Sequence, residues 1–329
     1  MSLSLQQSGA PLEPDSAALA ARSGNVLAVL DHLGTLQFSG EDAAAFLQGQ
    51  LTCDVEGLSP VLSTYGAYCS PKGRMLANFL LWQDAAGGVF MTLSRDILAL
   101  VQKRLSMFVL RSKVKISDTA GALTLIGAAG PQSVAAIGGA FSEVPRAPHE
   151  VRHQRAGTAI RLPDGRLVLA CAASQVTTLQ GQITPPLQAA SSSAWRWLDI
   201  RNGVPRVTAA TQDQLVPQMA NLELLGGISF TKGCYTGQEI VARTQHLGKV
   251  KRRMFLANVA AEAGAGDGLY AEDLGDQASG TIVNAEMSPD GGCDVLAVVQ
   301  IASRESSTVH LKSADGPALR FLPLPYSVT

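Results

Sequence analysis

The chain has 329 residues, of which 46% are hydrophobic and 16% are charged. This length suits two or three domains, and the composition is that of a globular protein with a substantial core. The net charge is −1, so the overall charge does not call for a nucleic-acid partner and any basic site has to be local. The five cysteines are scattered without a CxxC pair, which argues against a disulfide scaffold and against a stable metal site, and favours a reducing cytoplasm.

The first 24 residues lack the basic stretch and apolar core of a signal peptide, and they carry Glu13 and Asp15. They are predicted to form a loose tail. The longest apolar run, from Met75 to Trp82, is of strand length and is interrupted by Asn78. We therefore expect a soluble cytoplasmic protein without a membrane partner.

Residues 35–118 alternate between short elements. Ser39 and Asp42 have capping-box spacing before the first helix, and Ser94 is placed to cap the second. The second helix has one apolar face, made of Ile97, Leu98, Val101, Leu105 and Phe108. Strands are predicted over 35–40, 64–69, 74–82, 89–93 and 113–117, and helices over 41–51 and 95–107. This order predicts an α+β layer with helices on one face of a mainly antiparallel sheet.

A second unit is predicted over residues 119–190. It contains a strand over 122–127, a helix over 130–141, a hairpin over 158–171 with Asp164 and Gly165 at the turn, and a helix over 175–183. Residues 184–194 are interpreted as a linker. After Arg253, short segments separated by Gly and Asp predict a small β-barrel or sandwich.

Cys234 lies in the stretch KGCYTGQE, just before a predicted helix. Lys232 supplies a nearby cation and the helix start supplies a positive field, and both favour a thiolate. Gly233 and Gly237 allow the backbone to approach a ligand or to bend sharply. Two interpretations stay open: a reactive or ligand-contacting thiol, and a small apolar residue in a tight turn.

A cysteine–histidine hydrolase dyad is the weaker alternative for this thiol. His246 follows Cys234 closely, but no second element of a protease signature is present. The remaining histidines lack the spacing of metal ligands, and we interpret them as ordinary surface or hydrogen-bonded residues: His32, His149, His153 and His310.

A dense basic run follows the cysteine motif. It has five cations and no acid between residues 243 and 253: Arg243, Lys249, Lys251, Arg252 and Arg253. The run is either the solvated start of a strand or an anion site, for a polyanionic ligand tail or for RNA phosphate. Lys72 and Arg74 would add to it if their turn lies nearby. RNA contact is only weakly supported, because no interleaved aromatic residues accompany the cations.

Trp195 and Trp197 follow the linker. Alternate residues of a strand point to opposite faces, so one ring is predicted in the core and the other free to stack on a flat ligand. The alternative places both rings in the core or an interface.

The stretch NLELLGGISFTKGCYTGQEIVAR resembles the YgfZ-type folate-binding proteins, bacterial relatives of the glycine-cleavage T-protein. The stretches GEDAAAFLQGQLTCDV, YCSPKGRMLANFLLW, RLSMFVLRSKVKI and LPLPYS also match, so the resemblance covers nearly the whole chain from about residue 25. The family motif K-G-C-Y-x-G-Q-E is matched by Lys232, Gly233, Cys234, Tyr235, Gly237, Gln238 and Glu239.

The resemblance implies the T-protein fold, with two α+β domains and a C-terminal β-barrel around a central folate hole. Residues 25–118 with 195–245 would form a discontinuous folate-binding domain, residues 119–190 the second domain, and residues 246–329 the barrel. The expected ligand is tetrahydrofolate or a derivative. The positions associated with folate in the family fall on Trp195, Leu33, Asn78 and Arg201.

Departures from the T-protein pattern bear on catalysis. The catalytic aspartate of the T-protein falls near Ala77 and Asn78, neither of which serves as an acid or base. The resemblance therefore favours a non-catalytic, folate-dependent factor for assembly or repair of iron–sulfur enzymes, including those of tRNA methylthiolation, with client or assembly proteins as partners. In that function Cys234 would be a thiol or transient ligand, and the basic run would hold the glutamate tail of folate. The alternative is a folate-dependent aminomethyltransferase or demethylase.

Overall fold

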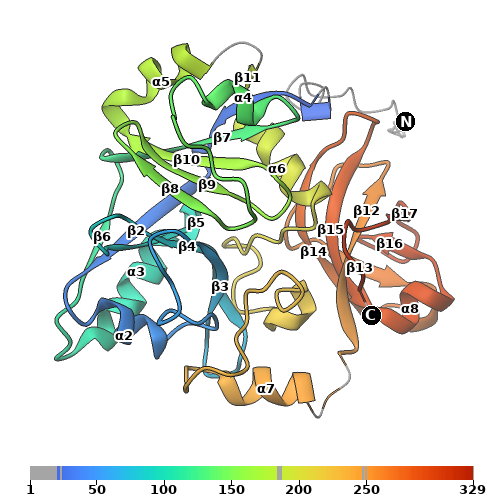
Figure 1. Ribbon diagram of the computed structural model, residues 1–329. Coiled ribbons are helices and arrows are strands. Elements are labelled where there is room, and N and C mark those ends of the chain that lie inside the picture. The colour runs from blue at the N-terminus through green and yellow to red at the C-terminus, as the bar shows by residue number, and fades with distance from the viewer. Residues whose placement is uncertain (1–20, 23, 184–186, 247, 249, 329) are drawn as a thin grey trace, which may run out of the picture.

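The computed structural model describes residues 21–22, 24–183, 187–246, 248 and 250–328. Three β-sheets with flanking helices make up this part of the chain (Figure 1). The predicted N-terminal tail falls almost entirely outside the described residues, as does Lys249 of the basic run.

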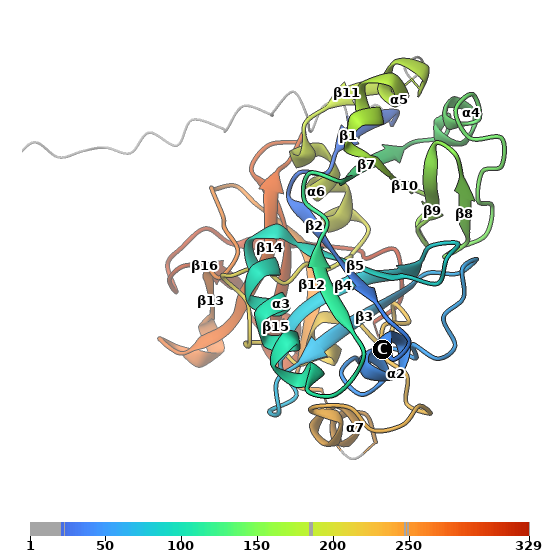
Figure 2. The same cartoon turned by 90° about the vertical axis from the view of Figure 1, so that its left-hand side faces the viewer.

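The first sheet has the strand order β3-β4-β5-β2-β6 and is antiparallel throughout. Its chain order, strand–helix–three strands–helix–strand, is the predicted one. The strands are β2 (Leu33–Ser39), β3 (Thr64–Cys69), β4 (Met75–Gln83), β5 (Val89–Ser94) and β6 (Lys115–Asp118), and the helices are α2 (Ala43–Gln48) and α3 (Arg95–Val109). Figure 2 shows α3 along one face of this sheet.

The helices of this layer differ from the prediction in two details. The capping box before α2 is not formed, because the Asp42 carboxylate accepts the backbone N–H of Lys113 at 2.7 Å instead. On α3, the predicted apolar face is buried through Ile97, Leu98, Val101 and Leu105, whereas Phe108 is 42% exposed.

The second sheet has the order β11-β1-β7-β10-β9-β8. Its strands are β1 (Val26–Val29), β7 (Leu123–Ala129), β8 (Val151–Gln154), β9 (Gly157–Arg161), β10 (Leu167–Ala172) and β11 (Gln188–Ala190). A short helix α4 (Ser133–Ile137), a 3-10 turn over 173–175 and α5 (Val176–Ile183) accompany it. The predicted hairpin is β9–β10, while β1 pairs with β7 and β11 although the first sheet follows it directly in sequence.

The third sheet has the order β16-β13-β14-β15-β12-β17. It consists of β12 (Arg252–Val259), β13 (Gly268–Ala271), β14 (Ala278–Met287), β15 (Cys293–Gln300), β16 (Val309–Leu311) and β17 (Leu319–Leu322), with a 3-10 turn over 272–274 and α8 (Ile301–Ser306). The sheet curls until its edges approach, and a bridge joins His310 of β16 to Ala318. The expected α+β class with a C-terminal barrel is confirmed.

Between the second and third sheets runs α6 (Ser192–Arg201), followed by the 3-10 turn η2 (Pro217–Ala220) and α7 (Gln238–His246). The prediction that Trp195 and Trp197 alternate on a strand is wrong, because both lie on α6. Sheets cover this helix on two sides, so Trp195 is 1% exposed and Trp197 is 8% exposed. Neither ring is free to stack on a ligand at the surface.

No helix among the described residues is long and apolar enough to cross a membrane.

Candidate functional site

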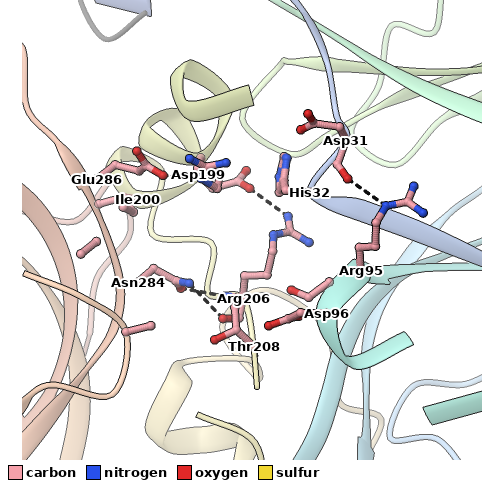
Figure 3. Close-up of a pocket in the computed structure, with 14 residues that line it drawn as sticks. Asp31, His32, Arg95, Asp96, Asp199, Ile200, Arg206, Thr208, Asn284 and Glu286 are labelled. Carbon is pink, nitrogen blue, oxygen red and sulfur yellow. Dashed lines mark hydrogen bonds and ion pairs between the residues drawn. The ribbon is translucent and has the colours of Figure 1, made fainter. Parts of the chain in front are cut away.

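A central cavity of about 550 Å³ lies where the first sheet, α6 and the C-terminal sheet meet (Figure 3). The loop between β1 and β2 contributes Asp31 and His32, and the start of α3 contributes residues 94–96. Another wall comes from α6 and the segment after it, with Arg196, Asp199, Ile200, Arg206 and Thr208. β14 closes the opposite side with residues 284–286. This volume is in the range of sites that hold a drug-sized organic ligand.

Several residues that line the cavity carry a buried polar atom with no hydrogen-bond partner among the described residues. They are both ring nitrogens of His32, Oγ of Ser94, Nε of Arg206 and Oγ1 of Thr208. Burying a polar atom without a partner costs roughly 1–3 kcal/mol, so such atoms are rare and need an explanation. Their concentration in one cavity indicates a site built for a polar ligand.

His32 is a neutral imidazole in this site. Burial, and then the positive charge of Arg206, lower the pKa of His32 to about 3. A neutral imidazole has one N–H donor and one acceptor nitrogen. The prediction that His32 is a surface or hydrogen-bonded histidine is wrong, because both of its ring nitrogens are buried without a partner among the described residues. The sequence has no ligand spacing around His32, and only the fold brings it close to the charge of Arg206.

Arg206 is held by a buried network of charges. The Asp199 carboxylate accepts from Nη2 of Arg206 and from Nη2 of Arg166, each at 2.8 Å, and Arg166 also donates to Asp164. Burial pushes the pKa of Asp199 upward, but Arg166 and Arg206 together hold it below its usual value. The network holds the guanidinium of Arg206 next to Asp199, and Figure 3 shows His32 near the same guanidinium.

Three of the four predicted folate positions lie beside the central cavity rather than in it. Leu33, Asn78 and Trp195 line a neighbouring cavity of about 30 Å³, which is too small for a ring system and shares Asp199 and Arg206 with the large one. The Asn78 amide donates to the carbonyl of Pro205 and accepts from the N–H of Val207, both at 2.7 Å. These two hydrogen bonds hold residues 205–207, the segment that carries Arg206, against β4.

Trp195 and Arg201 also have partners within the protein. The guanidinium of Arg166 lies 4.3 Å from the centre of the Trp195 ring. Arg201 is half-exposed at the end of α6 and faces Asp294 at 3.5 Å, outside the lining of the large cavity.

The KGCYTGQE motif forms a loop anchored by its lysine. Nζ of Lys232 donates to the backbone carbonyls of Gln48, Leu51 and Cys53, each at 2.7 Å. Gly237 has φ +82°, and a Cβ there would lie 2.5 Å from the carbonyl oxygen of Ser70, so the motif needs glycine at this position. Tyr235 is buried under the loop.

Cys234 is presented to solvent by this loop. It is exposed, whereas the other four cysteines, Cys53, Cys69, Cys171 and Cys293, are buried. The helix α7 starts at Gln238, with Glu239 in its first turn, and lies at the end of the molecule away from α6 in both views. Cys234 and Gly233 are not among the residues that line the central cavity, so the structure separates the thiol from that site.

The predicted basic patch is divided by the fold. Arg243 and Lys251 are exposed, and Arg252 is partly buried. Arg253 is 8% exposed and donates to the carbonyl of Gln218 and to the carboxylate of Glu223. Its charge is neutralised inside the protein, so Arg253 does not belong to a free cationic surface. The turn with Lys72 does lie next to α7, since Gly73 packs against Ile240.

The chain is 35% identical to the tRNA-modifying protein YgfZ of Sodalis glossinidius (strain morsitans) over 305 residues, which cover 91% of this chain and 92% of that protein. It belongs to the YgfZ family. The YgfZ protein of Yersinia pseudotuberculosis serotype O:1b (strain IP 31758) is 34% identical with the same coverage. No protein-family model matches the chain.

The fold of this YgfZ-family member is that of the T-protein. The glycine cleavage system aminomethyltransferase T from Bartonella henselae superposes with a TM-score of 0.77, covering 94% of this chain and 88% of that one at 16% identity. At this identity the similarity concerns the fold alone.

Among the described residues, no group of three or more His, Cys, Asp or Glu is arranged to hold a metal ion.

Proposed function

We propose that this YgfZ-family protein binds tetrahydrofolate or a derivative in the central cavity and supports the maturation of iron–sulfur enzymes, including those that methylthiolate tRNA. The observation that carries the folate part is the set of unpartnered buried polar atoms on His32, Ser94, Arg206 and Thr208 around a cavity of about 550 Å³. Relatives named tRNA-modifying protein and the T-protein fold support the rest.

The residues present fit a folate ring system. A pterin has neutral donors and acceptors along its edges, and the cavity offers both kinds of group through His32 and the hydroxyls of Ser94 and Thr208. Apolar wall comes from Ile200 and Ala265. When bound, a folate supplies a carrier for one-carbon units.

A role without turnover agrees with the state of the residues at the T-protein catalytic position. Ala77 is fully buried, and both functional atoms of the Asn78 amide are engaged by backbone groups at 2.7 Å. Neither residue is able to take up or release a proton. Cys234, exposed on a loop fixed by Lys232, is the group we assign to contact with a client or assembly protein.

Calorimetric titration with tetrahydrofolate tests the ligand. We expect saturable binding near one site per chain, and we expect Ala265→Trp, which fills the cavity without removing a polar group, to weaken binding at least about tenfold through steric conflict. Ala85→Trp places the same side chain on the exposed turn after β4 and is the control. No binding by the unmodified protein, or equal binding by the Ala265→Trp variant, would contradict the folate site.

Complementation tests the thiol. In a bacterial strain lacking its YgfZ-family gene, we expect the Cys234→Ala variant to leave tRNA methylthiolation unrestored, measured by mass spectrometry of the modified nucleoside. Because Cys234 is exposed, the substitution changes folding stability by no more than about 0.5 kcal/mol and leaves tetrahydrofolate affinity intact. Full restoration by this variant would eliminate the thiol role while leaving the folate site standing.

A further inference from the structure

The end of α3 carries a concentration of exposed apolar side chains. Met107 is 59% exposed, Phe108 is 42% exposed and Leu110 is 87% exposed. Leu100, two turns before Met107 on the same face of the helix, is 52% exposed. These are four of the nine large apolar residues that are exposed on the described part of the chain. A single exposed apolar residue needs no explanation, but a group of them in one place marks an interaction site.

Leu110 is held in solvent by the turn that ends the helix. Its φ is 47° and its ψ is −105°, a conformation that a bulky side chain rarely adopts. The N–H of Ser112 donates to the carbonyl of Val109 at 2.8 Å and closes the turn around it. Uncommon backbone conformations persist where the surrounding structure imposes them, and they are concentrated at functional sites. The fold thus presents this leucine instead of covering it.

The same end of the helix is positively charged. Residues 97–117 contain five cations and no acid: Lys103, Arg104, Arg111, Lys113 and Lys115. Two of them are used within the fold, because Lys113 pairs with Glu41 and Arg104 hydrogen-bonds to Tyr68. The side chains of the other three are exposed and make no hydrogen bond or ion pair with the residues that the structure describes. We define the α3-end surface as three apolar and three cationic residues: Met107, Phe108, Leu110, Lys103, Arg111 and Lys115.

We propose that the α3-end surface is a docking site for a partner protein whose contact segment carries both acidic and apolar side chains. An apolar centre with a charged rim is typical of protein interfaces, in which Met, aromatic residues and Arg are enriched. The unpaired cations complement acids on the partner and orient it. This inference rests on the proposed contact of Cys234 with a client or assembly protein, and it names the chemistry by which that partner is recognised.

Helix α2 joins the α3-end surface to the loop that presents Cys234. The N–H of Lys113 donates to the carboxylate of Asp42, directly before α2, at 2.7 Å. At the other end of α2, the carbonyl of Gln48 accepts from Nζ of Lys232 at 2.7 Å. A helix of this length spans only about 9 Å, whereas a standard interface covers about 800 Å² on each partner. One partner is therefore large enough to cover both the α3-end surface and Cys234.

Other occupants fit the α3-end surface less well. A symmetric dimer would place its cations against the same cations of a second copy. A nucleic acid offers phosphates to the cations but no apolar surface to Met107 and Leu110. A membrane takes up a broad apolar helix face, whereas α3 uses most of its apolar face to pack on the first sheet.

Site-specific photocrosslinking identifies the occupant. p-Benzoylphenylalanine replaces Leu110 in the full chain, expressed in the complementation strain. We expect an adduct with a protein whose attached peptide, sequenced by mass spectrometry, carries acidic and apolar residues. Reversing two cations, Arg111→Glu with Lys115→Glu, should lower the adduct yield at least about tenfold, because like charges then face each other. The control, Arg146→Glu with Arg155→Glu, reverses two exposed arginines next to β8 and should leave the yield unchanged.

Complementation tests whether docking serves the proposed function. We expect Leu110→Asp to lower the restored tRNA methylthiolation at least about fivefold, because an added acid repels an acidic partner. The melting temperature should stay within about 2 °C and tetrahydrofolate affinity should not change, since the substituted side chain is 87% exposed. The control is Val134→Asp, at a 37% exposed position on α4, which should restore methylthiolation fully.

The outcomes separate docking from the proposed function. An adduct with RNA, with lipid or with a second copy, a protein adduct that lacks acids at the attachment site, or no adduct overturns the docking site and leaves the folate site standing. Full restoration by Leu110→Asp, or a yield that charge reversal does not change, also overturns it. Failure of the unmodified protein to restore methylthiolation contradicts the proposed function, and the adduct then decides the docking site alone.

Discussion

The Asp199→Ala variant is expected to lose about 3–5 kcal/mol of unfolding free energy, because removing one partner of a buried ion pair leaves uncompensated charge in the interior. Asp199 is 4% exposed and lies between the guanidiniums of Arg166 and Arg206, at 2.8 Å from each. Arg166 retains Asp164, but Arg206 loses its only carboxylate partner among the described residues. The same change should weaken tetrahydrofolate binding, since it releases Arg206.

Thermal unfolding monitored by tryptophan fluorescence measures the loss, for which we expect a drop in melting temperature of roughly 4–7 °C. The control is Asp290→Ala, which removes an ion pair with Arg22 whose side chains are 59% and 65% exposed, and should cost less than about 1 kcal/mol. A melting temperature for Asp199→Ala within the range of that control would mean that the buried charges are not coupled as the structure indicates.

Many of the helices and strands could be predicted because they depend on the pattern of apolar and turn-forming residues close together in the sequence. The hairpin β3–β4 follows from two apolar runs around SPKG, and α3 follows from apolar residues at helical spacing after Ser94. These signals concern residues close in sequence. The position of β1 in the second sheet could not be predicted in this way. Its partner β11 lies about 160 residues away in the sequence, and no local pattern indicates that the two strands pair.

The two tryptophans show that a two-residue spacing does not by itself identify a strand. Trp195 and Trp197 are two apart, which suits a strand, but Ser191 and the following polar residues open a helix instead. Because a sheet lies on each side of α6, residues that face different directions on the helix are both buried. Tertiary packing, rather than the residue spacing, decides their environment.

The cavity residues were the hardest to predict. The resemblance names Leu33, next to His32, but it names neither His32 nor Arg206. What makes His32 and Arg206 functional candidates is that their polar atoms are buried without partners, a property of the assembled fold. The KGCYTGQE motif was visible in sequence, although the three carbonyls that bind its lysine were not.

That lysine should be the residue on which the presentation of Cys234 depends. In Lys232→Met the apolar stem is kept and the ammonium is removed, so the carbonyls of Gln48, Leu51 and Cys53 lose a charged donor at 2.7 Å. Hydrogen bonds to a charged group contribute about 1.5–3 kcal/mol each, and the three share one ammonium, so we expect the loop to lose roughly 2–4 kcal/mol against local opening.

Hydrogen–deuterium exchange reads this opening directly. The N–H of Ser229 donates to the carbonyl of Thr52 at 2.9 Å, across the junction that Lys232 stabilises, so this amide should exchange at least about tenfold faster in Lys232→Met. Amides of the C-terminal sheet should keep their rates, and Lys251→Met, at an exposed lysine, should change neither region. Unchanged exchange at Ser229 would show that the loop is held by Tyr235 and Gly237 without the lysine. In that case the presentation of Cys234 would be a matter of packing rather than of charge.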